Sequence, residues 1–126
     1  MQKVFLVDDS PLVRERLAQM IAALPQLQLV GQASDVAGAV SGILSARPDV
    51  VLLDLSLERG SGFDVLKALH GREPGIAFYM LSNLASAPYR RQAARLGAKD
   101  FFDKSSDMER LRAALKGEPQ CQPSSL

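Results

Sequence analysis

A run of four aliphatic residues that leads directly into a carboxylate constrains the fold of this chain more than any other feature. The run occupies residues 50–53, and the acid is Asp54. A segment this short and this uniformly apolar is typical of a strand buried on both faces, as in a parallel sheet that helices cover on each side. Asp54 would then lie at the carboxyl end of the strand, where open α/β sheets collect ligands and chemistry.

Short apolar segments recur along the chain and alternate with helical patterns. We expect strands over residues 4–7, 27–30, 50–54, 76–81 and 99–102. Helical periodicity or helix-start signals predict helices over residues 10–24, 35–46, 65–69, 86–96 and 106–115. Strands and helices that alternate with short connections predict an α/β fold, with helices on both faces of one parallel sheet.

Glycine and polar residues mark the expected ends of these elements. Residues 31–34 have the composition of a turn, and Gly97 is placed to end a helix in the left-handed conformation. Ser106 and Glu109 have the spacing of a capping box at the start of the last helix. The Gly-Ser-Gly triplet at residues 60–62 is predicted to be a turn, because it lacks the Gly-Lys-Ser/Thr ending of a phosphate-binding loop.

Polar residues follow four of the predicted strands. Because the carboxyl ends of parallel strands lie at one edge of a sheet, these residues are expected to face one crevice. Taken singly, the acids suit helix capping, the serine suits a turn and the lysine suits a solvated surface. Their coincidence favours a functional site, and its members are Asp8, Asp9, Asp54, Ser82 and Lys104.

Three carboxylates in one crevice repel one another, so one of them holds a proton at a raised pKa or a cation lies among them. Oxygen ligands with room for water suit Mg²⁺. A carboxylate beside Mg²⁺ can attack phosphorus and form an acyl phosphate. The phosphoryl oxygens then need positive charge and a hydrogen-bond donor, which Lys104 and Ser82 supply.

These residues resemble the receiver domains of two-component response regulators over residues 3 to about 116. Order and spacing agree throughout. The resemblance implies a flavodoxin-like sheet of five strands in the order 2-1-3-4-5 with five flanking helices. It makes Asp54 the phosphoacceptor, Lys104 and Ser82 its partners in phosphoryl transfer, and Ser82 with Phe101 the switch pair.

The resemblance also implies a cofactor and a donor. Asp9 and Asp54 would bind Mg²⁺ (or Mn²⁺) directly, Asp8 would bind it through water, and Ser56 would bind it through its backbone carbonyl. The phosphoryl donor would be a phosphohistidine on a sensor histidine kinase or a histidine phosphotransfer protein. The domain would act by binding an unknown downstream protein, without being an enzyme beyond its own phosphoryl transfer and slow dephosphorylation.

The sequence departs from the family pattern around the site. Many receivers have proline where this chain has Glu58, and proline after the lysine, where it has Ser105. We expect a different path for the final loop, with Lys104 still reaching the site. Ser56 and Leu84 are poorly suited to positioning a hydrolytic water, which predicts slow loss of the phosphoryl group.

Charge and length predict a small domain that contacts proteins. A net charge of +1 argues against nucleic acid or an anionic membrane as a direct partner. We expect a receiver over residues 1–117 and a flexible polar tail over 118–126, with no output module after it and a cytoplasmic location. His70 is predicted to be a surface imidazole, and Cys121 a bystander in the tail.

A cluster of cations near the fourth helix is the candidate partner surface. Solvated charge explains each residue singly, whereas the resemblance assigns an output face to Tyr89, Arg90, Arg91, Arg95 and Lys99. Two other functions stay open. A pseudo-receiver would bind proteins without taking phosphate, which the complete set of site residues disfavours. A haloacid dehalogenase-type phosphatase would need an acid where Ser56 stands.

Overall fold

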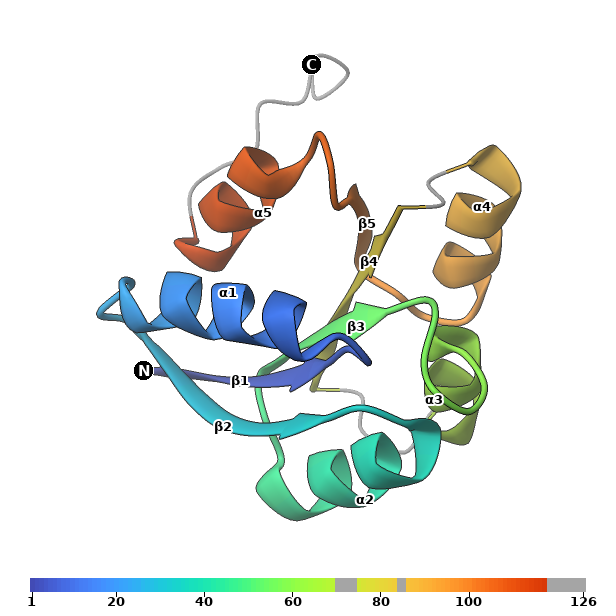
Figure 1. Ribbon diagram of the computed structural model, residues 1–126, viewed down its shortest axis with the longest axis horizontal. Helices are drawn as coiled ribbons and strands as arrows, with labels where there is room; N and C mark the ends of the chain where they lie inside the picture. Colours follow the sequence, from blue (N-terminus) through green and yellow to red (C-terminus); the bar gives the residue numbers. More distant parts are fainter. Residues whose placement is uncertain (70–74, 84–85, 118–126) are drawn as a thin grey trace.

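The computed structural model describes residues 1–69, 75–83 and 86–117. Its centre is a parallel sheet of five strands in the order β2-β1-β3-β4-β5 (Figure 1). The strands are β1 (Gln2–Val7), β2 (Leu27–Ala33), β3 (Val50–Asp54), β4 (Ala77–Ser82) and β5 (Asp100–Asp103). The predicted α/β class and strand order are therefore confirmed.

Helices cover both faces of the sheet. Figure 1 shows α1 and α5 on one face and α2, α3 and α4 on the other. The helices are α1 (Pro11–Ala22), α2 (Val36–Ala46), α3 (Gly62–Leu69), α4 (Ala87–Arg95) and α5 (Met108–Leu115). None of the helices within the described ranges has the length and apolar character that crossing a bilayer requires.

Alternate residues of the central strands supply two separate cores. In β1, Val4 and Leu6 pack with α1 and α5, whereas Phe5 and Val7 pack with the opposite helices. Successive side chains of a strand point to opposite faces, so a strand between two helical layers must be apolar at every position. All residues of the run at 50–53 are at most 4% exposed. The strand predicted from that run is therefore buried on both faces.

Several predicted boundaries differ from those of the structure, and two of the local signals used to place them are wrong. The turn expected at residues 31–34 is mostly strand, because β2 continues through Gly31 to Ala33 beside β1. A side chain at Gly31 would place its Cβ 2.6 Å from the Phe5 ring, so the glycine allows the backbone to lie against that ring. Gly97 does end a helix, as predicted, with a φ of +99°.

The capping box predicted at Ser106 and Glu109 is also wrong. The N-cap of α5 is Asp107, and its side chain makes no capping hydrogen bond. The Asp107 carboxylate instead accepts the backbone N–H of Asp103 over 2.8 Å. Hydrogen bonds within the turn after β5 therefore decide where α5 begins.

Candidate functional site

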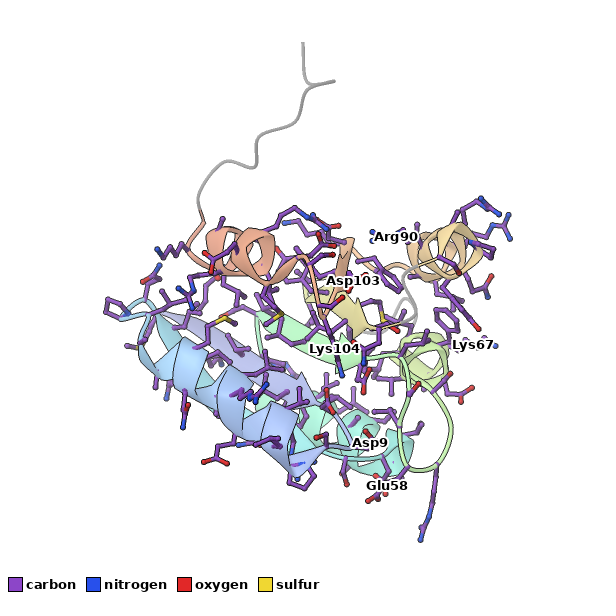
Figure 2. All side chains as sticks on the ribbon, turned by 45° about the horizontal axis from the view of Figure 1, so that its top comes forward. Asp9, Glu58, Lys67, Arg90, Asp103 and Lys104 are labelled. Carbon is purple, nitrogen blue, oxygen red and sulfur yellow. The ribbon has the colours of Figure 1, made fainter. Side chains whose placement is uncertain are left out.

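The ends of four strands surround one pocket of about 330 Å³. Asp8 and Asp9 follow β1, Asp54 ends β3, Ser82 ends β4 and Lys104 follows β5. All of them line the pocket. Figure 2 shows Lys104 reaching from the end of β5 toward the strand ends, with Asp9 and Glu58 beyond it in this view. The structure thus brings together the residues that the sequence places at the strand ends.

Three carboxylates form the acidic wall of this pocket. One oxygen from each of Asp8, Asp9 and Asp54 lies within 4.8 Å of the others. Asp8 is 1% exposed and Asp54 is 5% exposed, whereas Asp9 is half-buried. Carboxylate oxygens at this spacing, with one acid open to water, fit the oxygen ligands and retained waters of Mg²⁺.

The ammonium group of Lys104 joins two of the acids. Its Nζ lies 2.8 Å from Asp8 Oδ2 and 3.1 Å from Asp54 Oδ2. The other Asp8 oxygen accepts the backbone N–H of Ser10 over 2.9 Å. A buried carboxylate is tolerated when a cation and hydrogen bonds satisfy it, and Asp8 has both. Asp8 is accordingly fixed in place before any ligand enters the pocket.

Burial and charge shift two pKa values in this site. Burial, together with the negative charge of Asp8, raises the pKa of Asp54 to about 6, although the Lys104 ammonium lowers it in part. Burial opposes the charged form of Lys104, but hydrogen bonding to Asp8 and the charges of both acids outweigh it and raise the pKa of Lys104. At neutral pH the site therefore contains an ionised Asp54 that is held at a free-energy cost beside a permanent cation.

Ser82 and Phe101 are both buried beside the charged residues. Ser82 is 2% exposed, and its backbone oxygen accepts the N–H of Lys104 over 3.0 Å. The Phe101 ring is 4% exposed, with the guanidinium of Arg90 5.2 Å from its centre. The aromatic ring predicted to move is therefore in a buried position in this structure.

Ser56 lies at the rim of the pocket and is exposed. Its backbone N–H points to Asp54 Oδ1 over 3.4 Å, a long and weak hydrogen bond. Its side chain leaves the rim open. The remaining predictions near the rim and beyond, for Leu84, His70 and Cys121 with the 118–126 tail, concern residues outside the described ranges.

The residues of the predicted partner surface differ in their surroundings. Arg90 turns inward: it donates to the Phe101 carbonyl over 3.1 Å and lies 3.6 Å from Asp107. Tyr89 is 38% exposed and stacks on Phe63 of α3 at a ring separation of 6.3 Å. The exposed cations of the set are Arg91, Arg95 and Lys99.

Sequence reasoning missed two residues that shape the site. Arg14 donates from its guanidinium to the Asp8 backbone oxygen over 2.6 Å. A side chain at Gly62 would place its Cβ 2.5 Å from the Asp54 backbone oxygen, so this glycine allows α3 to begin against the end of β3. The second glycine of the triplet carried a signal for close packing, whereas Arg14 resembled any other polar helix residue.

Comparison with known proteins gives a consistent result. Residues 4–116 match the response regulator receiver domain. The chain is 36% identical over 116 residues to the DNA-binding transcriptional activator DevR/DosR of Mycobacterium tuberculosis, covering 92% of this chain and 54% of that protein. It is 38% identical over 116 residues to protein-glutamate methylesterase/protein-glutamine glutaminase 1 of Carboxydothermus hydrogenoformans, covering 90% of this chain and 34% of that protein.

Solved structures share the fold over most of the chain. The response regulator domain of Thermotoga maritima CheB superimposes with a TM-score of 0.80 at 28% identity, covering 91% of this chain and 90% of that chain. The chain spans about half or less of the two curated relatives, so their whole-protein activities do not transfer with the match. A match over nearly the whole described fold shows that this chain belongs to the family of response regulator receiver domains.

Proposed function

We propose that this receiver accepts a phosphoryl group on Asp54 in a two-component or phosphorelay system. The observation that carries the proposal is the Lys104 ammonium, which lies within 3.1 Å of a buried Asp54 beside a three-carboxylate cluster. A cation and a metal-binding set on either side of one nucleophile are the components that phosphoryl transfer needs. The donor in this proposal is a phosphohistidine on a sensor histidine kinase or a histidine phosphotransfer protein.

In the proposed reaction, an Asp54 carboxylate oxygen attacks the phosphorus of the donor. A new O–P bond forms, the N–P bond of the phosphohistidine breaks, and its electron pair stays on the imidazole nitrogen. Because the pKa of Asp54 is about 6, most of the carboxylate is ionised at neutral pH and available as the nucleophile. The nucleophile therefore needs no separate base.

Mg²⁺ (or Mn²⁺) would be held by Asp9, Asp54, the Ser56 backbone carbonyl and, through water, Asp8. When bound, the ion neutralises charge on the phosphoryl oxygens. Lys104 begins 3.1 Å from Asp54 Oδ2, so its ammonium is placed to move onto a phosphoryl oxygen once that carboxylate is phosphorylated. The Ser82 hydroxyl would donate to another phosphoryl oxygen.

The proposed output is a change in population between two surface conformations. A phosphoryl group on Asp54 would draw Ser82 inward and let Phe101, which is 4% exposed, fill the vacated space. Arg90 contacts both the carbonyl and the ring of Phe101, so α4 would respond to the aromatic side chain. The partner surface in this proposal includes Tyr89, Arg90, Arg91, Arg95 and Lys99.

The downstream partner is proposed to be a protein, with the chain acting in the cytoplasm and making no direct contact with nucleic acid or membrane. Slow dephosphorylation is proposed from Ser56, since a short hydroxyl side chain is poorly suited to holding a water in line with phosphorus. A half-life of the purified phosphoprotein of only seconds would contradict this part.

Intact-mass measurement after incubation with acetyl phosphate and Mg²⁺ tests the proposal. A single phosphoryl adduct is expected, and Asp54→Asn should abolish it. Asp49→Asn is the matched control, because Asp49 is an exposed acid just before the same strand, at its opposite end. Absence of any adduct would favour a pseudo-receiver, and multiple turnover of acetyl phosphate would favour a phosphatase.

A further inference from the structure

The turn that carries Lys104 is closed by side chains of the turn itself. Asp103 Oδ1 accepts the backbone N–H of Ser105 over 2.8 Å and the Ser105 hydroxyl over 2.6 Å. Asp107 Oδ2 accepts the backbone N–H of Asp103 over 2.8 Å. These contacts tie residues 103, 105 and 107 together around Lys104. We call this set, Asp103, Ser105 and Asp107, the lysine turn.

Backbone groups on both sides of Lys104 are held as well. The Lys104 N–H donates to the Ser82 carbonyl over 3.0 Å, and the Asp103 carbonyl accepts the Asp107 N–H over 2.9 Å. With the Ser105 N–H on Asp103, both peptide groups that flank the Lys104 Cα are fixed. The long, flexible side chain of Lys104 therefore starts from a fixed point, and its Nζ lies within 3.1 Å of carboxylate oxygens of Asp8 and Asp54.

The sequence gives this turn a particular reason to need side-chain bonds. Many receivers have proline where this chain has Ser105, and a proline ring fixes φ without help from neighbours. Serine leaves φ free and adds an N–H that can donate to a neighbouring acceptor. In this protein Asp103 receives that N–H and the hydroxyl from the same residue.

We propose that Asp103 and Asp107 are positioning residues for Lys104: their hydrogen bonds to the lysine turn hold the ammonium where phosphoryl transfer needs it. This inference rests on the proposed function. Fixing a reacting group in advance avoids the conformational entropy that it would otherwise lose in the reaction. A merely structural turn would stabilise the fold without any specific effect on Lys104.

A double-mutant cycle separates these two roles. The rate of Asp54 phosphorylation by acetyl phosphate with Mg²⁺ is measured for the wild type, Asp103→Ala, Lys104→Ala and the double variant. We expect Asp103→Ala to slow the reaction about tenfold, within the hundredfold that a misplacement of about 1 Å can cost. In the Lys104→Ala background the same substitution should have no further effect. An equal slowing in both backgrounds would overturn the proposal.

Conservative variants sharpen the test. Asp103→Asn keeps an oxygen acceptor for the Ser105 N–H and should react at close to the wild-type rate. Ser105→Ala removes only the hydroxyl contact and should slow the reaction less than Asp103→Ala does. If Asp103→Ala fails to fold, Ser105→Ala takes its place in the cycle: it should slow the reaction, by less than about tenfold, in the wild-type background and have no further effect in the Lys104→Ala background. Asp49→Ala is the matched control, since the Asp49 carboxylate also accepts a backbone N–H, that of Lys3 over 2.8 Å, but lies at the opposite end of the sheet.

A nuclear magnetic resonance measurement tests the positioning without the reaction. The ammonium signal of Lys104, assigned from its loss in Lys104→Ala, should be sharp in the wild type and in Asp103→Asn. It should broaden or shift toward that of exposed lysines in Asp103→Ala, and an unchanged signal would overturn the proposal. If the wild type takes no phosphoryl group, the proposed function fails while this measurement still decides the role of Asp103.

Discussion

The Lys104 ammonium donates to the Asp8 carboxylate over 2.8 Å, although the two residues lie 96 positions apart in the chain. Asp8 is 1% exposed, so its charge depends on this cation and on the Ser10 N–H for compensation. Removing one member of a buried ion pair leaves an uncompensated charge, which is the costly outcome for such pairs. The contact therefore joins the first and last strands through electrostatics as well as through the sheet.

Lys104→Met should destabilise the fold at neutral pH. The substitution keeps an apolar stem but leaves Asp8 and Asp54 without their shared cation, and we expect a loss of about 1–3 kcal/mol. The raised pKa of Lys104 contributes stability below its unfolded value of 10.5 that disappears as the pH rises through the folded value. The difference between wild type and variant should thus shrink in alkaline urea titrations. A variant of wild-type stability at pH 7 would show that the pair is energetically neutral.

Asp54→Asn should stabilise the protein at neutral pH. The folded state raises the pKa of Asp54 from 3.8 to about 6, so folding favours the protonated acid. Below pH 3.8 Asp54 is protonated in both the folded and the unfolded state. As the pH rises from 3.8 to about 6, the unfolded state loses this proton more readily than the folded state, so the free energy of unfolding falls. The shift corresponds to at most about 3 kcal/mol, and a gain of about 1–2 kcal/mol is expected because Lys104 loses a partner.

Urea unfolding at a series of pH values from about 3.5 to about 8, in steps of about one unit, measures this change in stability. The stability gap between wild type and Asp54→Asn should open as the pH rises and close at the acid end. Asp49→Asn, just before the same strand at its opposite end, makes the same acid-to-amide change away from the pocket and is the control. A gap independent of pH would mean that packing, not ionisation, distinguishes Asn from Asp.

Mg²⁺ should stabilise the fold through the acidic pocket. A ligand that binds only the folded state adds about 2.7 kcal/mol at a concentration of 100 times its dissociation constant. Asp9→Asn should remove most of this gain, because Asp9 is the half-buried acid of the cluster at Asp8, Asp9 and Asp54. Thermal unfolding with Mg²⁺ and with a chelator provides the measurement. Equal responses of Asp9→Asn and wild type would place the ion elsewhere.

The strand ends could be predicted from sequence because apolar runs and the polar residues after them are local signals. Residues 50–53 were readable as a two-face buried strand, and Asp54 followed as its tip. Parallel pairing then placed Asp8 and Lys104 at the same edge of the sheet. Their actual distance depends on loop paths and required the structure.

Two features of the fold could not be predicted from local sequence patterns. At Gly31 the backbone of β2 lies against the Phe5 ring of β1, and no local sequence pattern predicts that contact. The start of α5 was misplaced because Asp107 bonds to Asp103 rather than capping its own helix. Capping rules consider only hydrogen bonds within one helix end. Here the Asp107 side chain accepts an N–H from the end of β5 instead of one from its own helix.

Gly62→Ala should be among the most disruptive small substitutions. Its Cβ would lie 2.5 Å from the Asp54 carbonyl oxygen and 3.0 Å from the Met80 methyl group, so backbone must move. Overpacking of this kind costs about 1–3 kcal/mol. Gly75→Ala is the control, because nothing lies within 4 Å of a Cβ there. Urea unfolding should separate the two, and equal stabilities would show that α3 shifts freely away from β3.

The cations of α4 should separate into one structural residue and several exposed ones. Arg90→Glu would replace a donor to the Phe101 carbonyl with an acid facing Asp107, and we expect a loss of about 1–3 kcal/mol. Arg91→Glu changes a neighbouring exposed arginine by the same charge, and its effect should stay within about 0.5 kcal/mol. Urea unfolding of the two variants makes the comparison at equal net charge. Binding studies of the partner surface should therefore use Arg91→Glu with Arg95→Glu, since Arg90→Glu would confound binding with stability. Equal stability of Arg90→Glu and Arg91→Glu would contradict the role of Arg90 in holding α4 to β5.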